Sequence, residues 1–293
     1  MLYLVDASVY IFRAYYSLPD TFTDKDGHPA QAVYGFARFL LDFMRRKEPE
    51  YLACAFDESL TTSFRNELFP DYKANRELPP EELERQLKAC RDVAEALGIA
   101  SFSSDRYEAD DLIGSLALQH RSPERPICIL TRDKDLGQLI EPNDTWWDYA
   151  GDVRLDTAGV AEKMGVLPAV IPDLLGLMGD SVDNIPGVRG VGQKTAVALL
   201  RHFKDLDDLY ARLEDVGKLK FRGARSLAPK LEAEKDKAYL SRELATIKCD
   251  IPVCESLEVL RWQGADRERI ENLFERFSFG PRLKRDAEKL VAN

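Results

Sequence analysis

The sequence predicts an α/β fold in which a mainly parallel central sheet is flanked by helices and followed by a helical subdomain. Three short apolar runs, residues 2–5, 51–56 and 127–131, each lead within two positions to an aspartate, and segments with helical spacing lie between them. Apolar runs without alternation are typical of strands that a parallel sheet buries on both faces. Strands that alternate with helices indicate βαβ units and therefore a doubly wound sheet.

Two helices are expected in the first half of the chain. Residues 32–46 carry apolar side chains at helical spacing and end in basic residues, which are favourable beside the negative end of a helix. A second helix is expected to begin after the proline pair 79–80 and to stop near Gly98. These helices would cover the faces of the sheet.

The strand signal weakens after residue 156. Residues 174–178 and 193–203 have helical patterns, and a glycine-rich turn at 187–192 separates them, which predicts a helix–turn–helix arrangement. A strand-like stretch at 251–261 and a helix near 267–277 are expected to follow.

Charge is distributed unevenly along the chain. The net charge is −10 and the isoelectric point is near 5.0, which taken alone argues against binding to nucleic acid. Residues 187–248, however, contain 14 Lys and Arg against 9 Asp and Glu, a local net of +5, so that the rest of the chain carries −15. A metal site within the acidic part would explain this split.

The sequence also bears on the cellular compartment. The five cysteines are scattered without a C-x-x-C pair, which predicts reduced thiols. No apolar run approaches the roughly 18 residues that a membrane helix needs, and the first residues lack the basic start of a signal peptide. We therefore expect a cytoplasmic protein that does not contact a membrane.

Acidic residues gather where the predicted strands and helices meet. Ligands of open α/β sheets bind at the carboxyl ends of the strands, and residues at i and i+2 of an extended segment point the same way. Each of these acids alone could be a helix cap or a turn residue. Several at one sheet edge would repel one another unless cations neutralised them, and oxygen ligands in that number suit Mg²⁺ or Mn²⁺. The candidate metal ligands are Asp6, Asp57, Glu108, Asp110, Asp111, Asp133, Asp135, Asp180 and Asp183.

The three histidines of the chain lie outside these acidic motifs. A zinc hydrolase is therefore disfavoured, since such enzymes usually hold their metal through histidine.

Aromatic and basic residues mix in the segment after the second predicted strand. Phe64 and Arg65 are followed by Tyr72, Lys73 and Arg76, in a stretch with weak periodicity. Bases can stack on aromatic rings while Lys and Arg hold phosphates. A surface loop with solvated charges remains an alternative interpretation.

The glycine-rich turn is a second candidate for contact with phosphates. Gly187, Gly190 and Gly192 precede Lys194 and Thr195, where a backbone could approach a phosphate at the amino end of a helix. The spacing is neither that of the P-loop nor that of the dinucleotide fingerprint. A tight helix–helix turn is the alternative, and the local positive charge favours DNA.

Together these residues resemble the 5′-nuclease family, which comprises flap endonucleases and the 5′–3′ exonuclease domain of bacterial DNA polymerase I. The resemblance covers essentially the whole chain and is most specific in three motifs, YEADD at 107–111, TRDKD at 131–135 and GDSVDNIPG at 179–187. Since no room is left for a polymerase domain, it implies a stand-alone bacterial member. The implied organisation is a PIN-like catalytic domain at 1–165 with a helical arch at about 60–98, a helix–hairpin–helix subdomain at 166–250, and a C-terminal strand and helix at 251–293 that pack back on the catalytic domain.

The resemblance also implies roles for single residues. Asp6, Asp57, Glu108 and Asp110 would surround one Mg²⁺ or Mn²⁺, and Asp133, Asp135 and Asp183 a second, with Asp111 and Asp180 in support. Lys73 and Arg76 match the basic pair of the arch that acts on the scissile phosphate, and Tyr72 would stack near the substrate terminus. Further DNA contacts are expected from Arg13, Phe64, Gly187, Gly190, Gly192, Lys194 and Thr195, and the backbone at Val188 and Val191 would hold K⁺.

The implied activity is two-metal hydrolysis of DNA to 5′-phosphate and 3′-hydroxyl ends, as a 5′–3′ exonuclease and flap endonuclease. The expected partners are flap, nicked or 5′-ended duplex DNA and RNA–DNA primer ends, and we expect a monomer. A non-catalytic module that binds DNA structures and a toxin-like ribonuclease are the alternatives. The chain length and the turn at 187–195 argue against the second.

Overall fold

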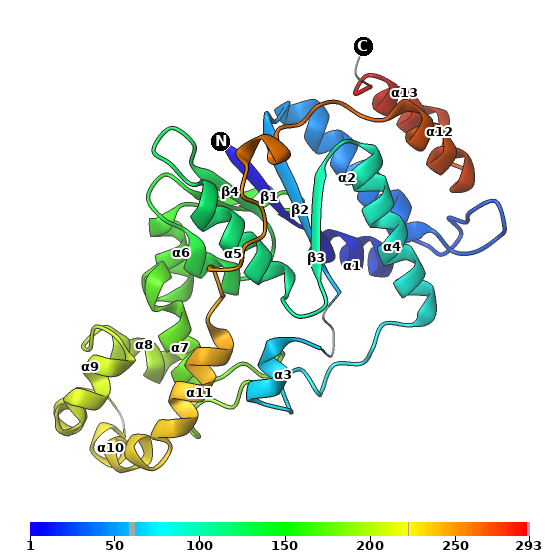
Figure 1. Ribbon diagram of the computed structural model, residues 1–293. Helices are drawn as coiled ribbons and strands as arrows, with labels where there is room; N and C mark the ends of the chain where they lie inside the picture. Colours follow the sequence, from blue (N-terminus) through cyan, green and yellow to red (C-terminus); the bar gives the residue numbers. More distant parts are fainter. Residues whose placement is uncertain (59–61, 222, 292–293) are drawn as a thin grey trace.

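The computed structural model describes residues 1–58, 62–221 and 223–291, and a six-stranded sheet forms its centre (Figure 1). Five strands are parallel, in the spatial order β3, β2, β1, β4, β5, and β6 is antiparallel to β5 at one edge. The predicted mainly parallel sheet is thereby confirmed. The strands are β1 Leu2–Asp6, β2 Tyr51–Asp57, β3 Ala100–Ser104, β4 Ile127–Leu130, β5 Thr145–Asp148 and β6 Val153–Leu155.

The register of the three central strands brings their carboxyl ends to one edge. Leu4 of β1 lies beside Ala53 of β2 and Ile129 of β4, and the same offset continues to the strand ends. The run of apolar residues allows this position, because a central strand needs buried side chains on both faces. The aspartates that follow these strands are therefore delivered to the same place.

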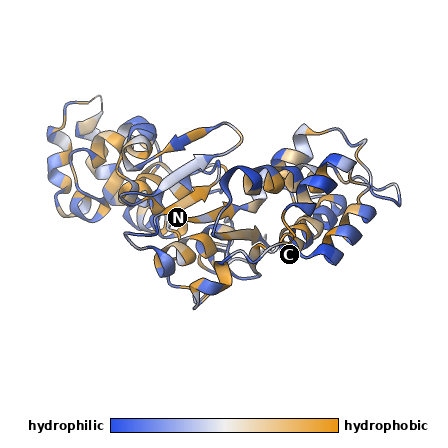
Figure 2. Ribbon diagram, turned by 90° about the horizontal axis from the view of Figure 1, so that it is seen from above, coloured by the Kyte–Doolittle hydropathy of each residue, from blue (hydrophilic) through white to orange (hydrophobic). Residues whose placement is uncertain are grey.

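Helices cover both faces of the sheet, and alternate residues of each strand enter different cores. Val5 and Leu130 point into a core with helices α1 Ala7–Ser17, α2 Gln31–Lys47 and α4 Glu81–Ala96, while Leu4 and Ile129 face α5 Ala109–His120. Figure 2 shows the apolar sheet between helices whose outer faces are polar. None of the helices in the described part of the chain has both the length and the apolar character that a membrane crossing needs.

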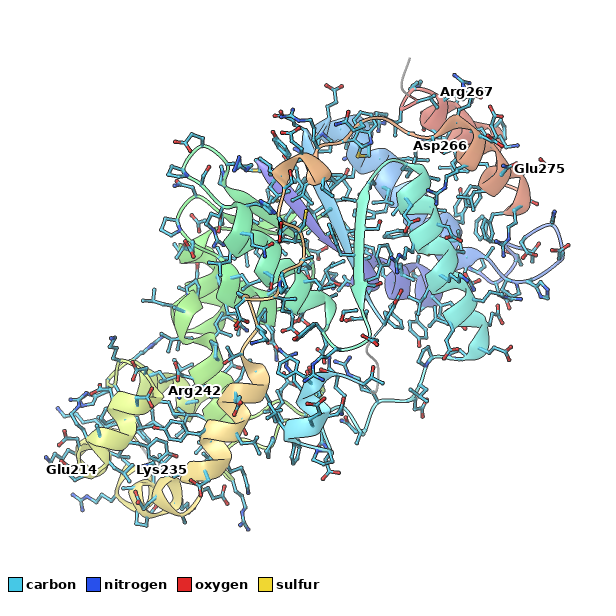
Figure 3. The ribbon with its side chains drawn as sticks, viewed as in Figure 1. Glu214, Lys235, Arg242, Asp266, Arg267 and Glu275 are labelled. Carbon is cyan, nitrogen blue, oxygen red and sulfur yellow. The ribbon has the colours of Figure 1, made fainter. Side chains whose placement is uncertain are left out.

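The second half of the chain forms a helical subdomain beside the sheet. Helices α7 and α11 pack side by side, and their apolar residues continue the core under α5 (Figure 1). Arg242 on α11, labelled in Figure 3, joins α11 to α7 and α9, because its guanidinium lies 3.3 Å from Asp173 of α7 and 2.9 Å from Asp207 of α9. The helices of this part are α6 Thr157–Met164, α7 Ile171–Met178, α8 Gln193–Leu200, α9 Leu206–Ala211, α10 Ala224–Ala233 and α11 Lys235–Ala245.

The C-terminal segment differs from the expectation of a strand. Residues 251–261 form no strand of the sheet. They run extended, include a short 3-10 turn at Leu257–Leu260, and touch β2 through one bridge between Tyr51 and Arg261. Pro252 lacks the N–H that a ladder requires, which helps to explain the failure of this prediction. Helices α12 Arg267–Arg276 and α13 Pro281–Glu288 then pack on α4 and α2.

The predicted arch also divides into parts with different surroundings. Its first helix is the short α3 Phe64–Leu68, and its second is α4, which packs on α2 with Leu83, Cys90 and Val93 buried. Because of this packing, α4 belongs to the layer of helices that covers the sheet. The part that stands over the edge of the sheet is the irregular segment 69–80; residues 59–61 of the predicted arch lie outside the described residues.

Candidate active site

A cleft of about 600 Å³ opens at the carboxyl ends of β1 and β2. Its lining mixes acidic residues with basic ones, which are Arg13, Lys73, Arg76 and Arg132. Six of the nine predicted metal ligands share this cleft, and they are Asp6, Asp57, Glu108, Asp110, Asp133 and Asp183.

Short contacts with the backbone and with hydroxyls fix acidic side chains of the cleft. The Thr131 hydroxyl donates to Asp6 over 2.8 Å, which links the ends of β1 and β4. The Ala109 N–H donates to Asp57 over 2.7 Å, so that the end of β2 holds the first turn of α5. The strand ends and the start of α5 thus bring their carboxylates into the same cleft.

The carboxylates of the cleft are incompletely neutralised. Burial and the nearby Asp57 raise the pKa of Asp6 to about 7, and burial together with Asp133 raises the pKa of Asp135 to about 8. Burial and the carboxylates of Asp133 and Asp6 likewise raise the pKa of Asp110. Such raised values mean that burial and neighbouring carboxylates oppose the ionisation of these groups.

One oxygen of Asp135 is an additional sign of a missing partner. Its Oδ1 atom is buried and has no hydrogen-bond partner among the described residues. A buried polar atom without a partner is costly, and such atoms often mark the position of an ion or a water. As they stand, no three Asp, Glu, His or Cys side chains in the described part of the chain are arranged to hold a metal ion.

Lys73 and Arg76 reach into the acidic cleft. The Lys73 ammonium lies 2.6 Å from Glu108 and 3.8 Å from Asp183, and Arg76 forms an ion pair with Asp183. Burial favours the protonated form of Glu108, but Lys73 and Arg65 outweigh it and lower the pKa of Glu108. In this structure the two cations therefore act as counterions of the carboxylates.

Asp111 lies outside the cleft, contrary to its predicted supporting role at a metal. It is fully buried, and both of its oxygens accept bonds of 2.7 Å from the guanidinium of Arg65. The N–H groups of Glu108 and Lys248 donate to the same carboxylate. No oxygen of Asp111 is left for an ion, and the helix-cap interpretation of this residue is the one that the contacts support.

Asp135 and Asp180 lie beside the cleft rather than along its walls. Asp180 accepts a bond of 2.9 Å from the Lys134 ammonium and one of 2.7 Å from the Val182 N–H. Burial raises the pKa of Asp180, but Lys134 and the backbone N–H groups of Val182 and Asp183 together outweigh this and lower it. Asp135 lies near both Asp133 and Asp183, whose charges contribute to its raised pKa.

The aromatic residues of the arch segment occupy positions that differ from the predicted ones. Tyr72 is only 4% exposed and its hydroxyl donates to Glu108 over 3.2 Å. A ring in this position has no free face for a base, so the expected stacking role is contradicted in this conformation. Phe64 is half-buried against Tyr107, at 5.8 Å between ring centroids, and Arg65 pairs with Asp111 instead of facing solvent.

Helix α1 contributes residues that the sequence did not single out. Val9, Phe12 and Tyr16 line the cleft together with Arg13, and Tyr16 is 75% exposed. Their spacing of three and four residues places them on one face of the helix that begins at Ala7, directly after Asp6. This spacing in the sequence could have identified them as residues of the site, because the helix starts beside Asp6, an expected metal ligand.

The glycine-rich turn is tightly folded on one side and open on the other. Gly187 has φ +59° and its backbone passes so near Gly179 that a Cβ would lie 2.3 Å from the Gly179 nitrogen. Around Gly190 and Gly192 a Cβ would meet nothing within 4 Å. The open side lies at the amino end of α8, where Lys194 is exposed and Thr195 is half-buried.

The predicted K⁺ positions lie inside this turn. The side chains of Val188 and Val191 are buried, and the Val188 carbonyl accepts a bond of 3.0 Å from the Val191 N–H. The turn is thereby held by its own backbone.

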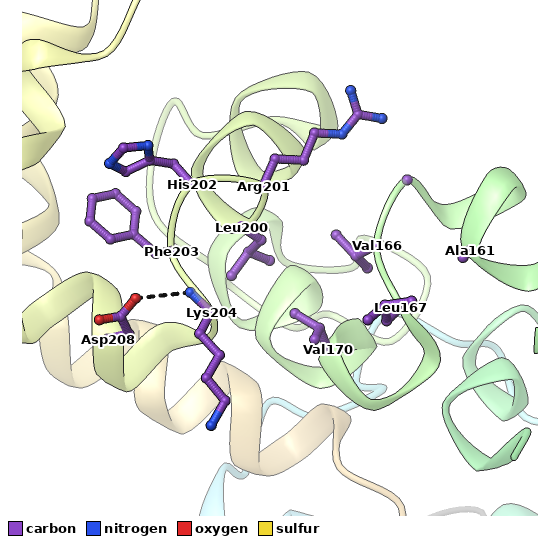
Figure 4. A pocket seen from close by; sticks show the side chains of 11 residues that line it. Ala161, Val166, Leu167, Val170, Leu200, Arg201, His202, Phe203, Lys204 and Asp208 are labelled. Carbon is purple, nitrogen blue, oxygen red and sulfur yellow. Dashed lines mark hydrogen bonds between the residues drawn. The ribbon is translucent and has the colours of Figure 1, made fainter. Parts of the chain in front are cut away.

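A second hollow of about 570 Å³ lies at the other end of α8 (Figure 4). Val166, Val170 and Leu200 line its apolar part, and Arg201 and Lys204 stand at its rim. The Lys204 N–H donates to Asp208 over 2.9 Å, which closes one wall. None of the predicted site residues lies here, so the acidic cleft is the candidate active site.

Comparison with known families identifies the family of the chain. The family model described as the 5′–3′ exonuclease N-terminal resolvase-like domain matches residues 1–165, and the model described as the 5′–3′ exonuclease C-terminal SAM fold matches residues 166–268. The chain therefore belongs to the 5′–3′ exonuclease family, as the sequence motifs predicted.

Two relatives show how the chain relates to longer proteins. It is 42% identical over 279 residues to DNA polymerase I of Pseudomonas aeruginosa, an alignment that covers 95% of this chain and 30% of the polymerase. It is 37% identical over 276 residues to a 5′–3′ exonuclease of Buchnera aphidicola subsp. Baizongia pistaciae, covering 94% of this chain and 91% of that protein. The chain thus spans about a third of the DNA polymerase I relatives and most of the exonuclease.

Solved structures share the fold. The T5 5′-exonuclease superposes with a TM-score of 0.66 at 17% identity, covering 94% of this chain and 99% of the other. The catalytic core of Rad2 superposes with a TM-score of 0.62 at 16% identity, covering 98% and 90%. The predicted fold class is confirmed by these neighbours.

Proposed function

We propose that this protein is a structure-specific 5′ nuclease that hydrolyses DNA phosphodiesters to leave 5′-phosphate and 3′-hydroxyl ends. The observation that carries the proposal is the cleft in which six carboxylates face Arg13, Lys73 and Arg76. A cleft with both charges suits a phosphodiester, because cations attract the phosphate while carboxylates hold the ions that hydrolysis needs.

The donor set fits two divalent cations of the Mg²⁺ or Mn²⁺ type. The cleft offers carboxylate oxygens without thiolate or imidazole, and Asp135 keeps a buried oxygen without a partner among the described residues. One T5 5′-exonuclease structure is described as holding divalent metal ions, in that case zinc. Asp6, Asp57, Glu108 and Asp110 would hold one ion and Asp133, Asp135 and Asp183 the other, with Asp180 in support. Bound ions would supply positive charge for the phosphodiester and lower the pKa of water.

In this proposal Lys73 and Arg76 have a role different from that of the carboxylates. They would bind the phosphate that is cut and stabilise the negative charge that develops on it, once the ions take over the carboxylates that they now neutralise. Arg13 would contact the same strand from α1. The open side of the turn at 187–195 would hold the duplex backbone, and K⁺ bound at Val188 and Val191 would strengthen that contact.

Relatives indicate DNA as the partner. Structures of the Rad2 catalytic core are described as complexes with DNA substrate, and the relative from Buchnera is named a 5′–3′ exonuclease. We propose flap, nicked and 5′-ended duplex DNA, together with RNA–DNA primer ends, as substrates of this chain, acting as a monomer in the cytoplasm of a bacterium.

One experiment tests the proposal. The purified protein is incubated with 5′-labelled flap, nicked, single-stranded and RNA–DNA substrates, each with Mg²⁺, with Mn²⁺ or with chelator. Short 5′ products from branched DNA are expected only with metal. Binding without cleavage under every condition would refute the enzyme and favour a non-catalytic module that recognises DNA structures. Asp135→Ala and Lys73→Ala should each nearly abolish turnover while DNA binding persists, and normal cleavage by either variant would refute the role of that residue.

A further inference from the structure

The segment that carries Lys73 and Arg76 is fastened to the loop that carries Asp183. Besides the contacts that the side chains of Tyr72, Lys73 and Arg76 make with Val182 and Asp183, three hydrogen bonds join them. The Lys73 N–H donates to the Asp183 carbonyl over 3.0 Å, Asn75 Nδ2 donates to the Ser181 carbonyl over 2.8 Å, and Asn184 Nδ2 donates to the Asp71 carbonyl over 2.6 Å. We propose that Asn75 and Asn184 are positioning residues of the nuclease reaction, which hold the two cations at the carboxylates of the cleft. This inference rests on the proposed function.

The arrangement is reciprocal. The amide of Asn75 reaches from the arch segment to the loop, and the amide of Asn184 reaches from the loop to the arch segment. The turn between them is compact, since the Ala74 N–H donates to Asp71 and the Arg76 N–H donates to Lys73. The two side-chain amides donate in opposite directions on either side of the hydrogen bond between the Lys73 N–H and the Asp183 carbonyl. They therefore restrict both sliding and separation of the two backbone segments.

The side-chain hydrogen bonds of Asn75 and Asn184, which we call the clamp, are necessary because little apolar packing holds the segment that carries Lys73 and Arg76. Residues 73–78 of the segment are exposed or half-buried, and Tyr72 is the anchor that the structure buries beside them. Such segments open readily when few contacts hold them. The ion pairs of Lys73 and Arg76 with the carboxylates cannot substitute for the clamp in the working enzyme, because those carboxylates would then bind metal. The two asparagines leave the charged groups free and still fix the backbone that carries them.

Asn184 is suited to this position by its backbone. Its φ is +55°, a left-handed conformation that asparagine and glycine adopt more easily than other residues. Asn184→Gly therefore removes the donor without adding backbone strain. Asn143, exposed and also left-handed with φ +76°, provides the matched control as Asn143→Gly. For Asn75→Ala, the exposed neighbour Glu77 gives the control Glu77→Ala.

The first measurement is hydrogen exchange on peptides that contain the Lys73 N–H, in the full chain with chelator. Removing one clamp bond should speed exchange at Lys73 about five-fold, and removing both in the double variant should speed it by more than about ten-fold. Asn75→Asp, which keeps the shape and removes the donor, should behave as Asn75→Ala. The two control variants should exchange like the parent protein. Unchanged exchange in both clamp variants would overturn the proposal.

The second measurement separates positioning from folding. On flap DNA with Mg²⁺, Asn75→Ala and Asn184→Gly should lower kcat about ten-fold with little change in KM. The side chains of Lys73 and Arg76 would be displaced from the positions in which they stabilise the transition state, while substrate binding would change little. Faster exchange with an unchanged kcat would overturn the positioning role. If the parent protein cuts none of the DNA substrates, the proposed function has failed, and the exchange experiment still decides whether the clamp exists.

Discussion

Asp110 and Asp111 are neighbours on α5 for which the structure predicts opposite effects of the same substitution. Asp111 is fully buried and makes a bidentate pair with Arg65, which is itself only 3% exposed. Asp111→Asn leaves that guanidinium without its counterion, and breaking a buried pair in this way costs about 3–5 kcal/mol. Asp110 has a strongly raised pKa because burial and the carboxylates of Asp133 and Asp6 oppose its ionisation. Asp110→Asn removes that repulsion, so the metal-free protein should become more stable by about 1 kcal/mol or more.

Urea unfolding with chelator at pH 7.5 measures both effects. With an m-value of about 3 kcal/mol/M, Asp111→Asn should lower the unfolding midpoint by about 1–1.7 M, and Asp110→Asn should raise it slightly. Asp105→Asn, an exposed carboxylate before the same helix, serves as the control and should leave the midpoint unchanged. If Asp110→Asn destabilises the protein as much as Asp111→Asn, the assignment of one residue to the cleft and the other to the interior is wrong.

Four other predictions concern the cleft and the turn. With chelator, the free energy of unfolding should rise as the pH falls from 8 to about 5, because Asp6, with its pKa near 7, binds a proton in the folded state at a higher pH than in the unfolded chain. Denaturant titrations at several pH values measure this free energy, and a decrease across that range would contradict the prediction. Lys73→Met should tighten Mn²⁺ binding several-fold, as measured by calorimetry, and should abolish turnover. The reason is that the Lys73 ammonium, 2.6 Å from Glu108, competes with a metal ion for this carboxylate. Weaker Mn²⁺ binding would exclude this competition. Tyr16→Ala should raise KM for a single-stranded flap about ten-fold, with Tyr16→Phe near normal, if this exposed ring stacks on a base; steady-state kinetics with an unchanged KM would show that it does not. Gly187→Ala should lower the free energy of unfolding, measured in urea, by more than about 2 kcal/mol, because the added Cβ would lie 2.3 Å from a backbone atom. Gly192→Ala should leave stability unchanged. Equal effects of the two substitutions would refute the close backbone approach at Gly187.

The strands that could be predicted from the sequence are those with continuous apolar runs. Strands β1, β2 and β4 lie at the centre of the sheet, where both faces of a strand must be apolar. Strand β3 has the sequence ASFSS and lies at an edge, so its polar residues give no such signal. Strands β5 and β6 have only four and three residues, which is too short for a pattern to stand out. Their pairing depends on neighbours that are distant in sequence.

The candidate ligands were predictable as a group, and their separate positions required the fold. A strand end points at the ligand edge of a parallel sheet, which is why Asp6 and Asp57 could be placed from the sequence. Consecutive residues of a helix point about 100° apart, so the YEADD motif could not reveal that Asp110 faces the cleft while Asp111 faces Arg65. That arginine is 46 positions away, and no local pattern links the two.

The charges of the cleft connect metal binding with DNA binding. Its walls carry six carboxylates against four cationic side chains, two of which neutralise Glu108 and Asp183 directly. If all of its carboxylates ionised, the cleft would keep an excess of negative charge beside the place where a phosphate would enter, and like charges in a partly buried site repel strongly. Cations bound to the carboxylates would offset this charge and free Lys73 and Arg76 for the phosphate. By linkage, DNA must then strengthen metal binding by the same factor by which metal strengthens DNA binding. Metal ions bound at these carboxylates would thus reduce the negative charge that opposes DNA binding by a chain with a net charge of −10.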